Sequence, residues 1–170
     1  FIDKEALLRG TSIYFPKRVI PMLPEKISND LCSLVPNEDR NVLVCKINYS
    51  KEGEINSYEF SEAVINSHKR FTYNEVEFIK QNKDINVSAH ILHSINALEK
   101  LTKQLLHNKS KRYALEIESS EPTLSLRNDG NISKILIPKR LFAHQMIEEA
   151  MISANICAAK FIKKHLGFGV

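Results

Sequence analysis

The sequence is poor in the residues that mark several common protein classes. It contains no tryptophan, five glycines and three cysteines among 170 residues. Scarce glycine argues against a glycine-rich loop protein, and the missing tryptophan argues against an aromatic sandwich core. Cys32, Cys45 and Cys157 lie far apart, and an odd count without Cys-X-X-Cys spacing argues against a disulfide framework and a structural zinc site. We therefore expect a reducing compartment, the cytoplasm.

Long apolar runs and charge blocks are also missing. No apolar run approaches the roughly 18 residues that a membrane-spanning helix requires, and no run of about five like charges forms a tail. Hydrophobic residues make up 43% and charged residues 26% of the chain, values ordinary for a globular domain. The net charge of +4 allows a polyanionic partner without requiring one. The sequence predicts one domain without membrane association.

The periodicity of apolar residues predicts an α+β fold with an antiparallel sheet. A helix after a candidate N-cap, Asp3, precedes a proline-punctuated connection in which Pro24 starts a short helical turn to about Asn29. A hairpin, two helices, a meander and a long helix follow, so the sheet packs on the long C-terminal helix and on shorter helices. The expected ranges are 3–9 (helix), 41–49 and 54–67 (hairpin), 72–79 and 87–108 (helices), 113–118, 123–127 and 131–137 (meander), and 140–166 (helix).

Several local signals fix these boundaries. Gly53 supplies the hairpin turn and Gly167 ends the long helix. Thr72 and Glu75 have the spacing of a capping box. Asn128-Asp-Gly130 predicts a turn in the meander. In the hairpin, one apolar face is expected to hold Leu43, Cys45, Ile47 and Tyr49, and a phase shift between Phe60 and Ala63 predicts a bulge.

No complete active site is evident from the motifs. The chain has no Gly-X-Ser-X-Gly nucleophile elbow, no phosphate-binding loop and no Gly-X-Gly-X-X-Gly. His90 and His93 lie one helical turn apart, but a solvated helix face explains them better than a metal site without a third ligand. Glu148 and Glu149 are adjacent on a helix and point about 100° apart, so they cannot easily share one metal.

The long helix carries a run of small residues around one polar residue, Asn155. Two interpretations remain open: a tightly packed buried helix with one satisfied polar side chain, or a helix that lines an active-site channel, with Glu148 two turns before Asn155 on the same side. The small residues are Ala150, Ser153, Ala154, Ala158 and Ala159.

Four ordered blocks resemble the RNB catalytic domain of the ribonuclease II and ribonuclease R family. They are Arg9-Gly-Thr-Ser-Ile-Tyr-Phe-Pro16, Pro21-Met-Leu-Pro-Glu-Lys-Ile-Ser-Asn-Asp-Leu-Cys-Ser-Leu34, His68-Lys-Arg-Phe-Thr-Tyr73, and Glu148-Glu-Ala-Met-Ile-Ser-Ala-Asn-Ile-Cys-Ala-Ala159 followed by Leu166-Gly-Phe-Gly169. The resemblance covers essentially the whole chain, and the Leu-Gly-Phe-Gly ending looks more like ribonuclease II than ribonuclease R.

The resemblance implies an exoribonuclease that processively degrades single-stranded RNA from the 3′ end to nucleoside 5′-monophosphates, with Mg²⁺ held by a cluster of aspartates. Two aromatic residues of such enzymes clamp the terminal bases by stacking, which needs no sequence readout. The tyrosine of this clamp matches Tyr73 and the phenylalanine matches Phe168. Glu148 and Asn155 become candidate channel-lining residues.

The same resemblance implies that this chain is an incomplete RNB domain. The aspartate cluster falls before Phe1 and an arginine-bearing motif falls after Val170, so no catalytic or metal-binding residue is expected within the chain, and the chain alone is expected to be inactive. An incomplete sheet should leave an exposed apolar patch or promote self-association. The alternative is a non-catalytic RNA-binding or protein-interaction module that uses the RNB fold, and a purely structural module is a third reading.

Overall fold

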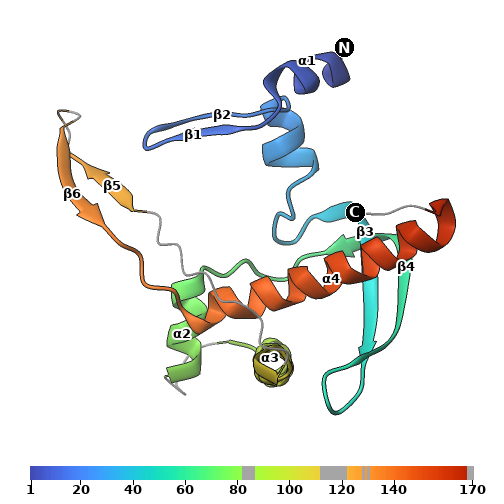
Figure 1. Ribbon diagram of the computed structural model, residues 1–170. Helices are drawn as coiled ribbons and strands as arrows, with labels where there is room; N and C mark the ends of the chain where they lie inside the picture. Colours follow the sequence, from blue (N-terminus) through green and yellow to red (C-terminus); the bar gives the residue numbers. More distant parts are fainter. Residues whose placement is uncertain (82–86, 112–121, 128, 130, 168–170) are drawn as a thin grey trace. The chain divides into compact units, whose positions relative to one another are not determined.

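The computed structural model describes residues 1–81, 87–111, 122–127, 129 and 131–167 (Figure 1). Helices and short two-stranded sheets alternate along these residues, as the α+β prediction requires. The helices are α1 (Ile2–Arg9), a π-helix η1 (Lys26–Leu31), α2 (Tyr73–Gln81), α3 (Ala89–Lys111) and α4 (Phe142–Leu166); the strands are β1 (Ile13–Phe15), β2 (Arg18–Ile20), β3 (Asp39–Tyr49), β4 (Ile55–Asn66), β5 (Thr123–Leu126) and β6 (Ile132–Leu136).

The chain divides into two compact units. The first comprises Phe1–Val42, Val64–Arg70 and Glu118–Lys139, and the second comprises Leu43–Ala63, Phe71–Ile117 and Arg140–Val170. The described strands form three two-stranded sheets, β1–β2, β3–β4 and β5–β6. The expected meander is thus seen as the β5–β6 pair alone, because its first predicted strand, 113–118, lies outside the described residues.

In the first unit, α1 starts earlier than predicted. Its N-cap is Phe1, which makes no side-chain cap, so the assignment of Asp3 as N-cap was wrong, and Asp3 lies instead in the first turn, where a negative charge favours the helix dipole. Gly10 ends the helix with φ 68°. An unpredicted antiparallel hairpin follows, with Ile13 opposite Ile20 and Phe15 opposite Arg18.

The π-helix η1 replaces the short helical turn expected after Pro24. After η1, the Arg40 side chain binds the chain on both sides. Its guanidinium donates to the Ser33 carbonyl at 3.0 Å and to the Glu38 carboxylate at 2.7 Å. The Arg40 side chain is 13% exposed, so these hydrogen bonds are largely shielded from water and hold the segment between η1 and β3. Further on, between β5 and β6, the backbone N–H of Arg127 donates to the carbonyl of Asn131 at 2.8 Å. Asn128 and Gly130 of the turn predicted here lie outside the described residues.

The β3–β4 hairpin turns where predicted, with Gly53 at φ 81°. Its burial phase differs from the prediction in β3, because Leu43 is 72% exposed while Val44 and Cys45 are both half-buried. Leu43 therefore does not share the inner face with Cys45. In β4 the predicted phase shift is present, since Ser61 and Glu62 are both exposed between half-buried Phe60 and Ala63.

The second unit is organised around α4. Its buried apolar residues are Ile79 of α2 and Ala143, Met146 and Cys157 of α4. In Figure 1, α2 crosses α4 near its N-terminal end, and α3 is seen end-on where it passes α4. Phe60 of β4 packs edge-on against Phe161 of α4, with ring centroids 5.2 Å apart. The predicted packing of the hairpin on the long helix is therefore confirmed.

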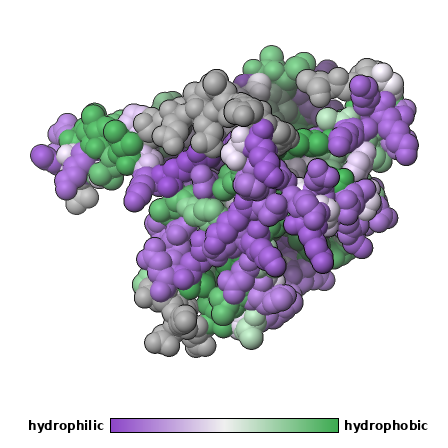
Figure 2. Space-filling view, turned by 60° about the horizontal axis from the view of Figure 1, so that its bottom comes forward, coloured by the Kyte–Doolittle hydropathy of each residue, from purple (hydrophilic) through white to green (hydrophobic). Residues whose placement is uncertain are grey.

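Apolar side chains also remain on the surface. Figure 2 shows hydrophobic patches between the hydrophilic side chains of the face in view. The exposed apolar residues of α4 include two pairs one turn apart: Ile147 with Met151, which is 60% exposed, and Ile162 with Leu166, which is 61% exposed. Exposed apolar area of this kind favours contact with another apolar surface. Within the described ranges, no helix is both long and apolar enough to cross a membrane.

Candidate functional site

Tyr73 occupies the first turn of α2, where the predicted capping box holds the backbone. The backbone N–H of Thr72 donates to the Glu75 carboxylate at 2.6 Å, and the backbone N–H of Glu75 donates to Thr72 Oγ1 at 3.2 Å. This reciprocal pair fixes the start of the helix and therefore the direction in which the next side chain leaves it. Tyr73 is 43% exposed, so its ring is available to a ligand.

One face of the Tyr73 ring is covered by His144 of α4. The two ring centroids lie 3.9 Å apart, and the planes are inclined by 23°, which is a stacked arrangement. His144 Nδ1 accepts the backbone N–H of Leu141 at 3.1 Å, so the imidazole also caps α4. The stack joins residues that are far apart in sequence, and sequence reasoning gave no sign of it.

A second link holds α2 against the start of α4. The Glu77 carboxylate, one turn after Tyr73, accepts the backbone N–H of Ala143 at 2.8 Å. Lys80, almost one turn further on, lies 4.2 Å above the Phe142 ring and 3.4 Å from the Glu99 carboxylate of α3. The hydrogen bond from Lys103, then the nearby charges, lower the pKa of Glu99 despite its partial burial. The start of α2, which carries Tyr73, is thus held by polar contacts to α3 and α4.

The adjacent carboxylates Glu148 and Glu149 have different surroundings. Glu149 is 5% exposed, and the Lys109 ammonium of α3 lies 3.5 Å from its carboxylate. Glu148, whose side chain is 37% exposed, pairs with Arg140 and lies 3.8 Å from the same ammonium. Lys109 thus joins two side chains that leave the helix in different directions.

Asn155 does not behave as the buried polar residue of the packed-helix interpretation. It is exposed, whereas the buried polar residues of α4 are Glu149 and Ser153, one turn apart, with buried Cys157 one turn further on. Of the small residues, Ser153 is buried, Ala154, Ala158 and Ala159 are half-buried, and Ala150 is exposed. Close packing against α4 therefore involves only part of the run. The sequence pattern did not predict that Glu149 would be buried.

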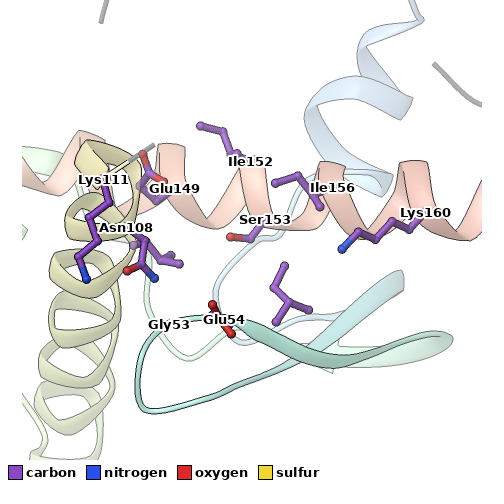
Figure 3. A pocket seen from close by; sticks show the side chains of 11 residues that line it. Gly53, Glu54, Asn108, Lys111, Glu149, Ile152, Ser153, Ile156 and Lys160 are labelled. Atoms are coloured by element: carbon purple, nitrogen blue, oxygen red, sulfur yellow. The ribbon is translucent and has the colours of Figure 1, made fainter. Parts of the chain in front are cut away.

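A cavity of about 400 Å³ lies between the β3–β4 turn, α3 and α4. Figure 3 shows Glu149, Asn108 and Lys111 grouped where α3 meets α4, and Lys160 further along α4. Two carboxylates and two ammonium groups line the cavity, so it offers a phosphate no net attraction. The lining residues are Gly53, Glu54, Ile55, Leu105, Asn108, Lys111, Glu149, Ile152, Ser153, Ile156 and Lys160.

The acidic residues that the structure describes do not fit a magnesium site. In the part of the chain that the structure describes, no three His, Cys, Asp or Glu side chains are gathered as a metal site requires. Glu148 and Glu149 are each engaged by basic side chains, and magnesium sites need carboxylate oxygens free to bind the metal. His90 and His93 are exposed on α3, in agreement with a solvated helix face. Phe168 lies outside the described residues.

Comparison with known proteins shows that nearly the whole chain matches one protein family. The RNB domain pattern matches residues 1–168. Ribonuclease R of Buchnera aphidicola subsp. Schizaphis graminum is 46% identical over 170 residues, covering 96% of this chain and 23% of the relative. Exoribonuclease 2 of Psychromonas ingrahamii is 36% identical over 175 residues, covering 99% and 27%. These identities do not support the leaning toward ribonuclease II that the Leu-Gly-Phe-Gly ending suggested.

Solved structures match as well. Mycoplasma genitalium ribonuclease R in complex with ribose-methylated single-stranded RNA superposes with a TM-score of 0.89 at 32% identity, over 96% of this chain and 26% of that one. Yeast Ssd1, described as a pseudonuclease, shares the fold with a TM-score of 0.69 at 15% identity, over 98% and 20%. The chain spans about a quarter of the length of the relatives it matches.

Proposed function

The chain belongs to the RNB domain family of ribonucleases, and from that premise we propose that it is part of the catalytic domain of a processive 3′→5′ exoribonuclease. The substrate is single-stranded RNA, and the products are nucleoside 5′-monophosphates. The observation that carries the proposal is the match along 96% of the chain to a ribonuclease R solved with single-stranded RNA, at 32% identity.

Within this function, Tyr73 stacks on a base near the 3′ end of the RNA. Tyr73 is 43% exposed and its ring is backed by a stacked imidazole, which suits a sequence-independent platform because every base offers a flat π face. Phe168 is the second aromatic residue of the clamp. Glu148 and Asn155 line the channel that leads to the reaction centre; both have solvent-accessible side chains, which such a role requires.

The proposed enzyme requires Mg²⁺, and we propose that the metal ligands lie outside this chain. Supporting this, the two adjacent carboxylates of α4 are engaged by Lys109 and Arg140. The 170 residues therefore supply the RNA-holding side of the centre and do not hydrolyse RNA alone. Free thiols at Cys32, Cys45 and Cys157 suit the cytoplasm, where we place the enzyme.

Hydrolysis of a single-stranded oligoribonucleotide with Mg²⁺ tests the proposal. The isolated chain and the complete protein that carries it are assayed side by side, with chelator and with a substrate blocked at its 3′ end as controls. We expect nucleoside 5′-monophosphates from the complete protein only, and none with the blocked substrate. Products from the isolated chain would refute its inactivity, while internal cleavage of the blocked substrate would refute the exonuclease direction.

A non-catalytic RNA-binding or protein-interaction module is the second candidate. The likeness to yeast Ssd1 supports this candidate, because the same fold occurs there in a protein described as a pseudonuclease. RNA binding by the complete protein without Mg²⁺-dependent product would favour this candidate.

We also propose that the isolated chain self-associates through the exposed apolar side chains of α4. Met151 and Leu166 are each about 60% exposed, and water-exposed apolar area of this kind favours contact with a second apolar surface. Sedimentation velocity over a range of protein concentrations measures this. Replacing both residues by lysine should reduce the association, and a chain that stays monomeric at every concentration would contradict it.

A further inference from the structure

The walls of the cavity between the β3–β4 turn, α3 and α4 combine apolar side chains with charges of both signs. We propose that this cavity is a docking site for a segment of the same polypeptide that lies outside the 170 residues. That segment places an apolar side chain between the walls and a carboxylate against Lys160. The inference rests on one part of the proposed function, namely that this chain is a piece of a longer catalytic domain.

The three walls of the cavity are joined to one another by direct contacts. The Glu52 carbonyl of the turn accepts amide protons from Gln104 at 3.0 Å and from Asn108 at 2.6 Å, both on α3. The Lys109 ammonium of α3 in turn lies 3.5 Å from the Glu149 carboxylate of α4. The cavity is therefore held in shape by contacts within this chain, which lowers the entropy that a docking segment must lose.

A nearly buried hydroxyl group faces the cavity. Ser153 of α4 is 5% exposed and lines the cavity, and its hydroxyl makes no hydrogen bond to any residue that the structure describes. Figure 3 shows this side chain on the side of α4 that faces the β3–β4 turn. A hydroxyl removed from water favours a partner that replaces its lost hydrogen bonds, and a polypeptide segment offers backbone N–H and C=O groups for this purpose.

Two charged side chains of the lining also have no ion pair within the described ranges. They are Lys160 of α4 and Glu54 of the turn, whereas Glu149 is paired with Lys109. In Figure 3 the Lys160 side chain reaches back along α4 toward Ser153. A cation on one wall and an anion on another attract a partner that carries charges of both signs. This charge pattern favours a polypeptide over the uniformly negative backbone of RNA.

Apolar side chains supply much of the remaining lining. Ile152 and Ile156 of α4 are 38% and 37% exposed, and Ile55 and Leu105 are half-buried. An apolar side chain seated against them would remove this area from water, which is favourable. The cavity volume of about 400 Å³ lies in the range of pockets that bury ligands larger than one side chain. Several side chains of one segment can therefore enter it.

The length of the relatives assigns the occupant to the same polypeptide. The chain spans only about a quarter of the relatives that it matches, so most of their length lies elsewhere. A segment attached to the same polypeptide is present at a high effective concentration. It therefore docks in preference to a separate protein of equal intrinsic affinity.

Photo-crosslinking in the complete protein that carries this chain identifies the occupant. A lysine analogue with a diazirine replaces Lys160. In a control protein the analogue replaces Lys103, whose side chain is 65% exposed and outside the cavity lining. Isotopically light and heavy proteins are mixed before irradiation, so that mass spectrometry separates links within one polypeptide from links between two. We expect the probe at Lys160 to link within one polypeptide to a segment outside this chain, and the probe at Lys103 not to link to that segment.

The other possible results would each overturn the inference. Links from the probe at Lys160 that stay within this chain would mean that no outside segment reaches the cavity. Links between light and heavy copies would assign the cavity to a second copy of the protein. Links to RNA or to a different protein would assign it to that partner.

A charge exchange tests the carboxylate contact separately. Lys160→Glu should lower the thermal unfolding midpoint of the complete protein by a few degrees, and changing the linked carboxylate to lysine as well should recover most of that loss. Two losses that simply add would contradict the contact. RNA hydrolysis by the same preparations keeps the two proposals apart. An inactive protein with the expected link would refute the proposed activity alone, and an active protein without the link would refute the docking alone.

Discussion

The buried ion pair between Lys109 and Glu149 yields the sharpest prediction for stability. Glu149 is 5% exposed, and the Lys109 ammonium lies 3.5 Å from it and 3.8 Å from Glu148. Replacing Lys109 by methionine keeps the aliphatic length of the side chain but leaves the Glu149 carboxylate buried without its cation. Breaking a buried pair in this way costs about 3–5 kcal/mol when both charges are fully buried.

The Lys109 side chain is 19% exposed, so water compensates part of the loss, and we expect a destabilisation of about 2 kcal/mol. Lys103→Met is the matched control on the same helix. Its ammonium lies 2.7 Å from Glu99 but its side chain is 65% exposed, so the cost should be about 0.5 kcal/mol. Changing Lys109 and Glu149 together to methionine should recover most of the lost stability, because no unpaired charge remains buried.

Urea unfolding followed by far-ultraviolet circular dichroism measures these differences, since a shift of the midpoint at constant slope reports a change in the free energy of unfolding. A Lys109→Met variant no less stable than Lys103→Met would refute the reasoning. So would a double variant whose loss equals the sum of the two single losses, because that result would mean that the two side chains do not interact.

Three further predictions concern local features. The pKa of Glu99 in the folded protein is lowered, chiefly by its hydrogen bond from Lys103. Its contribution to the free energy of unfolding is therefore full above the unfolded pKa near 4.5 and is lost as the pH falls through the folded pKa. Glu99→Gln should reduce this loss of stability in acid, and an unchanged dependence of stability on pH would contradict the prediction. Thr72→Ala removes the hydroxyl that accepts the Glu75 backbone N–H and should cost about 1 kcal/mol in urea unfolding. An unchanged unfolding midpoint would count against the cap. Burial raises the pKa of the Cys157 thiol, so a thiol reagent should modify exposed Cys32 first and Cys157 only on unfolding. Mass spectrometry of the modified peptides measures the order, and modification of Cys157 before Cys32 would contradict the prediction.

Features set by neighbouring residues in sequence were predictable. The capping box of Thr72 and Glu75, the turn at Gly53 and the helix stop at Gly167 all follow from local backbone chemistry, and the structure has each of them. The β1–β2 hairpin was not predictable by the same means. Its strands have three residues each and nearly all are exposed, so no alternation of apolar and polar residues marks them.

The long-range contacts of the candidate site could not be read from the sequence. Lys109 and Glu149 are 40 residues apart, and nothing local indicates that α3 crosses α4 at this point. The stack of Tyr73 on His144 likewise depends on how α2 meets α4. Tyr73 itself was found because the resemblance to a family singled it out, and a capped helix start alone would have predicted only a packing residue.

The β3–β4 turn also has a consequence for the order of folding. The Glu52 carbonyl accepts amide protons from both Gln104, at 3.0 Å, and Asn108, at 2.6 Å, across 52 and 56 residues of chain. The hairpin can close early because its own residues suffice, whereas these two hydrogen bonds require α3 to be formed and docked. We therefore expect the loss of the Asn108 amide to accelerate unfolding while leaving the folding rate nearly unchanged. The turn thus forms from local residues, but its hydrogen bonds to α3 connect the hairpin to the helix only late in folding.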